Sequence, residues 1–96
     1  MTDDPDELAA LREEIDRLDG RLADIVAERV STAEAVAEVK AGADRDLVDE
    51  SREAAVKSHH ERLFEERDLD GAAGRDLAEL LIELSLARER TVEGEH

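Results

Sequence analysis

The sequence predicts an all-α fold in which each chain gives one long helix and two shorter helices to an intertwined homodimeric bundle. Aromatic residues make up 1% of the chain, with Phe64 alone, so the core has to be built from Leu, Ile, Val and Ala. These residues favour helices packed on helices, and no segment has a strand pattern. A single domain of 96 residues buries only about 60 to 65% of its unfolded surface, so it gains from a partner.

The long helix is predicted over residues 6–41 and is ended by Gly42. Its inward positions follow one another at alternating steps of three and four, which is a heptad seam. The seam consists of Leu8, Leu11, Ile15, Leu18, Leu22, Ile25, Arg29, Thr32, Val36 and Val39. A helix of this length in so short a chain needs a second copy, or the rest of the chain, along its apolar side.

Two shorter helices are predicted over residues 49–67 and 72–91, with short polar tails at both ends of a single domain over 1–96. The first of them starts near Asp49 or Ser51, where Ser51 offers an N-cap. It has a thin inward stripe that includes Val56, His59 and Leu63 and stops at the turn over 69–71. The other has a clear amphipathic pattern. Its apolar residues are Leu77, Leu80, Leu81, Leu84 and Leu86.

The composition argues against a metal or a cofactor. The chain has no cysteine, which excludes disulfides, thiolate metal sites and cysteine nucleophiles. His59 and His60 are adjacent and therefore lie on different sides of a helix, and no Gly-rich phosphate loop is present. Three closely spaced aspartates lack the glycine and glutamate spacing of a calcium loop: Asp44, Asp46 and Asp49.

The net charge of -15 repels nucleic acid and anionic lipid, so we expect neither as a partner. The N-terminus has no basic and apolar leader, and no segment has the ~20 apolar residues that span a bilayer, so we expect a cytoplasmic protein. Lys40 and Lys57 are the only lysines among 13 basic residues. This acidic, lysine-poor balance is similar to that of proteins from salt-loving archaea.

Charged side chains interrupt the apolar faces where a core is expected. Arg29 occupies a seam position that suits Leu, and Lys40, eleven residues later, returns to nearly the same face. A charge in a seam costs several kcal/mol unless it is paired, although a polar residue that sets the register would also explain Arg29.

The other two helices carry similar polar groups. Asp49, Arg52 and Glu53 share a face with Val56, and Ser85 and Glu89 are one turn apart. The remaining arginines are interpreted as solvated charges or members of ion pairs within a helix. They are Arg17, Arg21, Arg45, Arg62, Arg67, Arg75, Arg88 and Arg90.

Five segments together resemble the all-helical (AroQ-type) chorismate mutases in order and spacing. They are residues 11–19 (LREEIDRLD), 27–29 (AER), 39–40 (VK), 48–53 (VDESRE) and 82–85 (IELS). The resemblance covers residues 8–90 and rests on the combination, because no single segment is specific. It implies an isomerase that rearranges chorismate to prephenate.

The resemblance also implies roles for the charged residues. Arg12 and Arg29 would hold the two substrate carboxylates, with support from Arg52 and Ser85. Lys40 would donate to the ether oxygen of the substrate.

Three acidic residues complete the implied site. Glu53 would accept a hydrogen bond from the ring hydroxyl of the substrate, and Asp49 would orient its neighbours or this hydroxyl at the edge of the site. Glu89 stands where many members carry glutamine, and it can donate to the ether oxygen only while its carboxyl is protonated.

The implied reaction agrees with the residue inventory. A Claisen rearrangement is unimolecular and pericyclic, so it needs no nucleophile, metal or cofactor. It needs the carboxylates clamped in a near-attack geometry and cations placed where negative charge grows on the ether oxygen.

Helix geometry predicts that two chains share each site. Arg12 and Arg29 are separated by seventeen residues, about 25 Å along a straight helix, so both cannot touch one ligand of roughly 10 Å. If two long helices pair antiparallel and cross near Leu22, Arg12 of one chain lies near Arg29 and Lys40 of the other.

Two alternatives stay open at this point. The chain is also similar to isochorismate pyruvate lyases, which have the same fold and much the same charged cage. Such an enzyme eliminates pyruvate and does not rearrange its substrate. The chain could also be a non-catalytic coiled-coil interaction module in which the seam charges only set the register.

Overall fold

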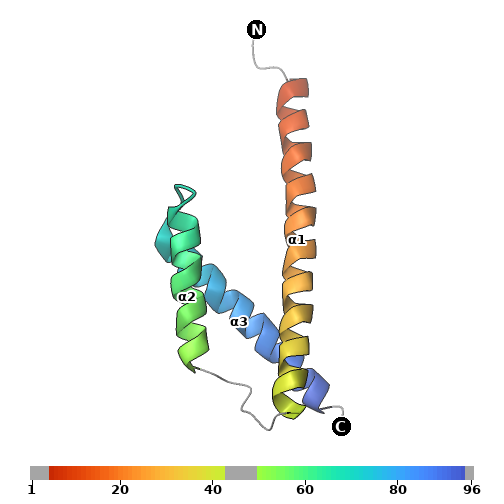
Figure 1. The fold of residues 1–96 in the computed structure, drawn as a ribbon. Coiled ribbons are helices and arrows are strands. Elements are labelled where there is room, and N and C mark those ends of the chain that lie inside the picture. Colours follow the sequence, from red (N-terminus) through yellow and green to blue (C-terminus); the bar gives the residue numbers. More distant parts are fainter. Residues whose placement is uncertain (1–4, 43–49, 95–96) are drawn as a thin grey trace.

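The computed structural model describes residues 5–42 and 50–94. Within them the chain forms the helices α1 (Pro5–Gly42), α2 (Glu50–Glu65) and α3 (Gly71–Gly94) and no strand (Figure 1). The predicted all-α class with one long and two shorter helices is therefore confirmed for this part of the chain. Asp49 lies outside the described residues. Ser51 is already helical, so its predicted role as N-cap of α2 is wrong.

Helix α1 runs the whole length of the molecule, whose longest extent is 65 Å. Its 38 residues have Asp6 and Glu7 in the first turn and Lys40 in the last, charges that suit the helix dipole at both ends. Gly20 does not interrupt the helix, because its position is open and its conformation is helical. None of the helices in the described residues has the length and apolar character that a membrane span requires.

Helix α2 ends two residues earlier than predicted, because Asp68 takes the left-handed conformation with φ 60°. The Leu69 N–H donates to the Phe64 carbonyl at 2.9 Å, and the Asp68 N–H donates to the Glu65 carbonyl at 3.2 Å. This pair of bonds is a Schellman motif, which satisfies the last carbonyls of the helix and turns the chain. The stop signal is therefore Asp68 and not the later glycine.

Helix α3 begins at Gly71 because Asp70 caps it. The Asp70 Oδ1 accepts a bond of 3.0 Å from the Ala72 N–H, an N-cap contact. Gly74 then allows α3 to lie close against α2, since a Cβ there would approach the His60 carbonyl oxygen to 2.5 Å and the Phe64 Cγ to 2.9 Å. The hairpin of α2 and α3 is thus fixed by a cap, a turn and a small residue.

The inward stripe predicted on α2 is partly wrong. Val56 is buried and Leu63 is half-buried, but His59 is exposed. His60 is the partly buried histidine, and its Nδ1 lies 3.0 Å from the Val56 carbonyl oxygen. The face therefore follows steps of four and three from Val56 through His60 to Leu63.

Helix α3 packs against both α1 and α2, so the small core lies along α3. The buried apolar residues are Val30, Ala37, Val56, Ala78 and Leu81. Figure 1 shows that α3 crosses the C-terminal half of α1, while the N-terminal half of α1 stands clear of α2 and α3. The site described below forms where the three helices come together.

The apolar seam in the N-terminal half of α1 is uncovered in the single chain. Its members are between 49% and 59% exposed: Leu8, Leu11, Ile15, Leu18, Leu22 and Ile25. The chain exposes 7432 Å² in total, against about 5,500 Å² for a compact protein of this mass. Its radius of gyration is 18.0 Å, against about 12.5 Å for a compact domain of this length. One chain alone does not bury its longest apolar surface.

Candidate active site

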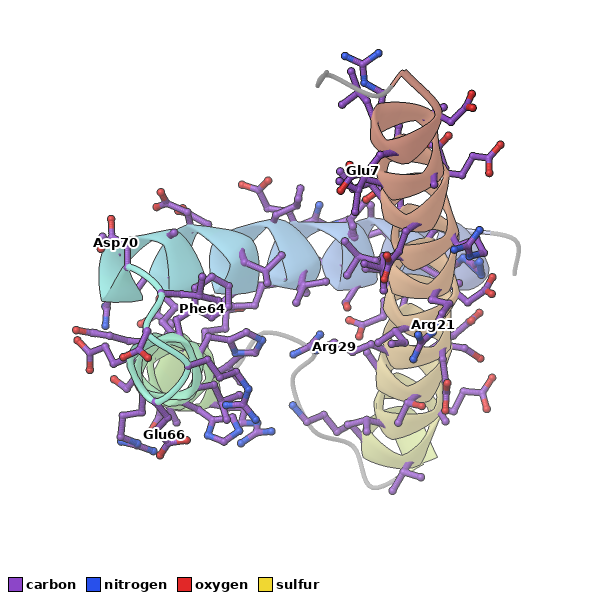
Figure 2. The ribbon with its side chains drawn as sticks, turned by 90° about the horizontal axis from the view of Figure 1, so that it is seen from above. Glu7, Arg21, Arg29, Phe64, Glu66 and Asp70 are labelled. Carbon is purple, nitrogen blue, oxygen red and sulfur yellow. The ribbon has the colours of Figure 1, made fainter. Side chains whose placement is uncertain are left out.

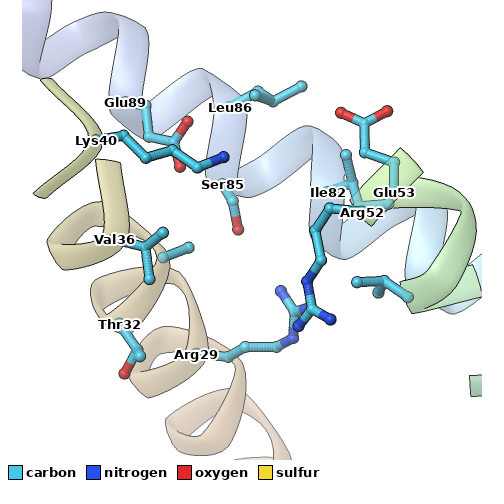
Figure 3. A pocket seen from close by; sticks show the side chains of 12 residues that line it. Arg29, Thr32, Val36, Lys40, Arg52, Glu53, Ile82, Ser85, Leu86 and Glu89 are labelled. Carbon is cyan, nitrogen blue, oxygen red and sulfur yellow. The ribbon is translucent and has the colours of Figure 1, made fainter. Parts of the chain in front are cut away.

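A cavity of about 310 Å³ lies between the C-terminal half of α1, the first turns of α2 and the second half of α3 (Figure 3). This volume is at the lower end of the range for small-molecule sites. Six residues predicted for the site line it. They are Arg29, Lys40, Arg52, Glu53, Ser85 and Glu89.

Three cations reach the cavity from two helices. Arg29 and Lys40 lie three turns apart on the same side of α1, and Arg52 comes from the first turn of α2. Figure 2 shows Arg29 reaching from α1 toward α2, and in Figure 3 the heads of Arg29 and Arg52 point toward each other. The planar forks of two guanidinium groups match the two oxygens of a carboxylate. The arrangement therefore favours a carboxylate ligand.

Helix α3 adds a hydroxyl and a carboxyl on one side of the cavity. Ser85 is 6% exposed, and its Oγ donates to the Leu81 carbonyl at 2.9 Å. A hydroxyl rotates to suit its acceptor, so Ser85 can also donate to a bound anion. Glu89 lies one turn further, beside Lys40 (Figure 3). Glu53 contributes the other carboxyl from α2.

The rest of the cavity wall is mainly apolar. It consists of Ala33, Val36, Val56, Ile82 and Leu86. Such a wall displaces water and strengthens the electrostatic contacts that the charged residues make inside it. Thr32 also lines the cavity, and sequence reasoning placed it in the seam without a role in the site. Its Oγ1 donates to the Glu28 carbonyl at 3.0 Å.

Among the described residues, one residue predicted for the site, Arg12, does not line this cavity. Arg12 is on the exposed N-terminal half of α1, and the seventeen residues between it and Arg29 correspond to about 25 Å of helix. Asp49 lies outside the described residues, so its predicted position is untested. A single chain thus brings together the larger part of the predicted cage but not the arginine of the first helical turns.

Two comparisons with known proteins identify the family. Residues 11–90 match the family described as chorismate mutase type II. The chain belongs to this family. It is also 31% identical over 85 residues to a chorismate mutase of Methanocaldococcus jannaschii, a match that covers 88% of this chain and 86% of that protein. No solved structure matches.

Membership of the chorismate mutase type II family confirms the resemblance found in the sequence, and it classes the chain as an isomerase. The matched range includes every residue predicted for the site, from Arg12 to Glu89. The family comparison does not test the role of any single residue, so these roles stay predictions.

Three of the arginines interpreted from sequence as solvated charges or members of ion pairs within a helix form ion pairs at the surface. Their partners and N–O distances are Glu66 at 3.7 Å for Arg67, Glu61 at 2.9 Å for Arg75 and Glu34 at 3.5 Å for Arg88. The first pair joins neighbouring residues. The other two join different helices, so they are not the pairs within a helix that the sequence predicts. None of these residues lines the cavity. The cations that line the cavity are therefore different residues from these three surface arginines.

Within the described residues, no three acidic or histidine side chains lie together as a metal ion would require.

A second, more open groove of about 720 Å³ lies between α1 and α3. It is lined mainly by apolar residues, with Leu22, Val26 and Val30 from α1 and Leu84 and Ala87 from α3, and Asp19 and Arg88 lie at it as well. This groove continues the uncovered surface of α1.

Proposed function

We propose that this chain is a chorismate mutase that converts chorismate to prephenate, by a Claisen rearrangement without a cofactor, for phenylalanine and tyrosine biosynthesis. The observation that carries the proposal is the meeting of Arg29, Lys40 and Arg52 around one cavity in a chain of net charge -15. The family membership supports the same conclusion.

The arginines act by holding the substrate in a reactive shape. Chorismate carries two carboxylates, one on the ring and one on the enolpyruvyl arm. Arginine pairs with a carboxylate through two parallel hydrogen bonds, so Arg29 and Arg52 can fix the position and the rotation of the group they hold. Holding the arm over the ring in a near-attack geometry removes much of the entropic part of the barrier. Ser85 adds a further donor to this clamp.

Lys40 and Glu89 act on the bond that breaks. As the ether bond lengthens, negative charge grows on its oxygen, and a cation fixed there stabilises the transition state more than the ground state. Lys40 supplies this cation, and protonated Glu89, beside it in Figure 3, donates a second hydrogen bond. The Glu53 carboxylate accepts a hydrogen bond from the ring hydroxyl, and Asp49 orients its neighbours at the edge of the site.

The proposal includes an intertwined homodimer in which Arg12 of a second copy completes each site. The uncovered seam of α1 supports this, because six Leu and Ile side chains about half exposed are a surface that a second copy would bury. Antiparallel pairing near Leu22 would carry Arg12 across to the cavity of the partner, where it would hold the other carboxylate. Each chain then acts as one domain.

We also propose that the enzyme works in the cytoplasm of a salt-loving organism. The excess of acids over bases, 28 against 13, supports this proposal, since an acidic surface stays hydrated in concentrated salt. In dilute buffer the same charges repel one another and repel a dianionic substrate.

The direct test is loss of chorismate absorbance with purified protein in concentrated potassium chloride, with prephenate identified as the product. Isochorismate is assayed in parallel, because formation of salicylate and pyruvate from it would assign the cavity to a lyase. The Arg29→Ala variant is the control for a contaminating host mutase. Turnover that persists unchanged in this variant, or no turnover by the wild type, would contradict the proposal.

A further inference from the structure

An ion pair joins α1 to α3 close to the cavity. The Arg88 guanidinium lies 3.5 Å from a Glu34 carboxylate oxygen, and the two side chains are 52% and 23% exposed. On α1, Glu34 lies between Val30 and Ala37, two buried residues of that helix. The pair therefore borders the place where α3 rests on α1.

The apolar contact at this crossing is small. Only Val30 and Ala37 are buried on the described part of α1, and neither is a large side chain. Small apolar contacts give little resistance to rotation or sliding of one helix on another. A charged contact at the edge of such a crossing restricts that motion.

The position of the pair relates it to the cavity. Glu34 directly follows Ala33, and Arg88 directly precedes Glu89, and both Ala33 and Glu89 line the cavity. Lys40 is on α1 and Glu89 is on α3, so their separation depends on how these two helices cross. The clamp made by Arg29 and Arg52 instead joins α1 to α2.

We propose that Glu34 and Arg88 form a positioning pair, which holds α3 against α1 and so sets Glu89 and Lys40 in the geometry that the reaction needs. Neither residue touches the substrate. The inference rests on the proposed function, because it assigns to the pair an effect on the reacting end of that site. It predicts an effect on turnover, since contacts to the ether oxygen strengthen in the transition state, and little effect on KM.

The sign of the effect separates positioning from simple charge. Glu34→Gln removes a negative charge from the surroundings of a dianionic substrate, and through-space electrostatics alone would raise activity. Arg88→Gln removes a positive charge and would lower it. A positioning pair is broken by either change, so both variants should turn over more slowly.

The test is a double-mutant cycle measured at one fixed salt concentration. We expect Glu34→Gln and Arg88→Gln each to lower kcat about twofold to fivefold, the range that an exposed ion pair can supply, with KM changed less. The double variant should lose no more than either single variant, because the second change finds the pair already broken. Melting curves check that the variants are folded.

A control is the pair of Arg75 and Glu61, which joins α3 to α2 at 2.9 Å, has side chains 45% and 38% exposed and lies outside the cavity wall. The cycle of Glu61→Gln and Arg75→Gln should leave kcat unchanged. Equal losses in this control would show a general effect of breaking surface pairs and would overturn the proposal.

Other outcomes also decide. An unchanged or raised kcat in Glu34→Gln, or additive losses in the double variant, overturns the positioning role. A loss that disappears at high protein concentration assigns the pair to assembly and overturns it as well. Wild-type turnover with unaffected variants removes only this inference, whereas absence of wild-type turnover removes the proposed function together with it.

Discussion

Truncating Leu18 to alanine should weaken the proposed dimer by an amount that follows from its exposure. The side chain is 50% exposed in the single chain, so about half of it remains to be buried by a second copy. Leucine to alanine removes roughly three methylene equivalents of about 0.8 kcal/mol each, so the half that is left contributes about 1.2 kcal/mol per chain. Two copies per dimer give about 2.4 kcal/mol, or about a 50-fold rise in the dissociation constant.

The assay is sedimentation and activity per chain over a dilution series. Activity should fall together with dimer content, because each site lacks Arg12 when the chains separate. Leu69→Ala is the matched control, since Leu69 is 52% exposed but lies in the turn between α2 and α3. If both variants dissociate at the same concentration, or if the wild type is a fully active monomer, the reasoning from the uncovered seam is wrong.

Three further predictions concern charge. Molar potassium chloride should raise the melting temperature and the activity, because at ~1 M salt a screening length of ~3 Å removes the repulsion within a chain of charge -15; a steady fall of both with salt would contradict this. Lys40→Met should lower kcat at least ~100-fold, the usual effect of losing a donor to a developing anion, whereas Lys57→Met on the outside of the cavity should not; similar losses in both would remove Lys40 from its role. Turnover should fall as rising pH deprotonates Glu89, and Glu89→Gln, which donates at every pH, should flatten the profile over the same range; an unchanged alkaline decline in Glu89→Gln would exclude that role.

The long helix and the inward arginine could be predicted from sequence because both depend on a regular repeat. The heptad seam specifies one face of α1 along its length, and Arg29 stands on that face whatever the rest of the chain does. Lys40 follows Arg29 by eleven residues, about three helical turns, which predicts that it returns to nearly the same face, and both residues line the cavity. Periodicity along one helix is a local property, so it is read without knowledge of the tertiary structure.

A backbone conformation that the sequence does not signal, and contacts that depend on two helices or two chains, could not be predicted. The sequence places the end of α2 at a turn that includes Gly71, whereas the residue in the left-handed conformation is Asp68. Aspartate tolerates this conformation, but an aspartate in the sequence does not by itself predict it. Arg88 was interpreted as an ordinary surface charge, since its contact with Glu34 exists only at the angle at which α3 crosses α1. The structure of one chain does not place Arg12 at a cavity, because the residues proposed to surround it belong to a second chain.

The shared site is tested most directly by mixing two inactive variants. Arg12→Ala and Arg29→Ala should each be nearly inactive, because each removes one carboxylate clamp from every site. When they are unfolded and refolded together, about half of the dimers are mixed, and in each mixed dimer one site has both arginines while the other has neither. The mixture should therefore recover roughly a quarter of the wild-type rate per total site. No recovery, although mass spectrometry shows that mixed dimers have formed, would contradict a site built from Arg29 of one chain and Arg12 of the other.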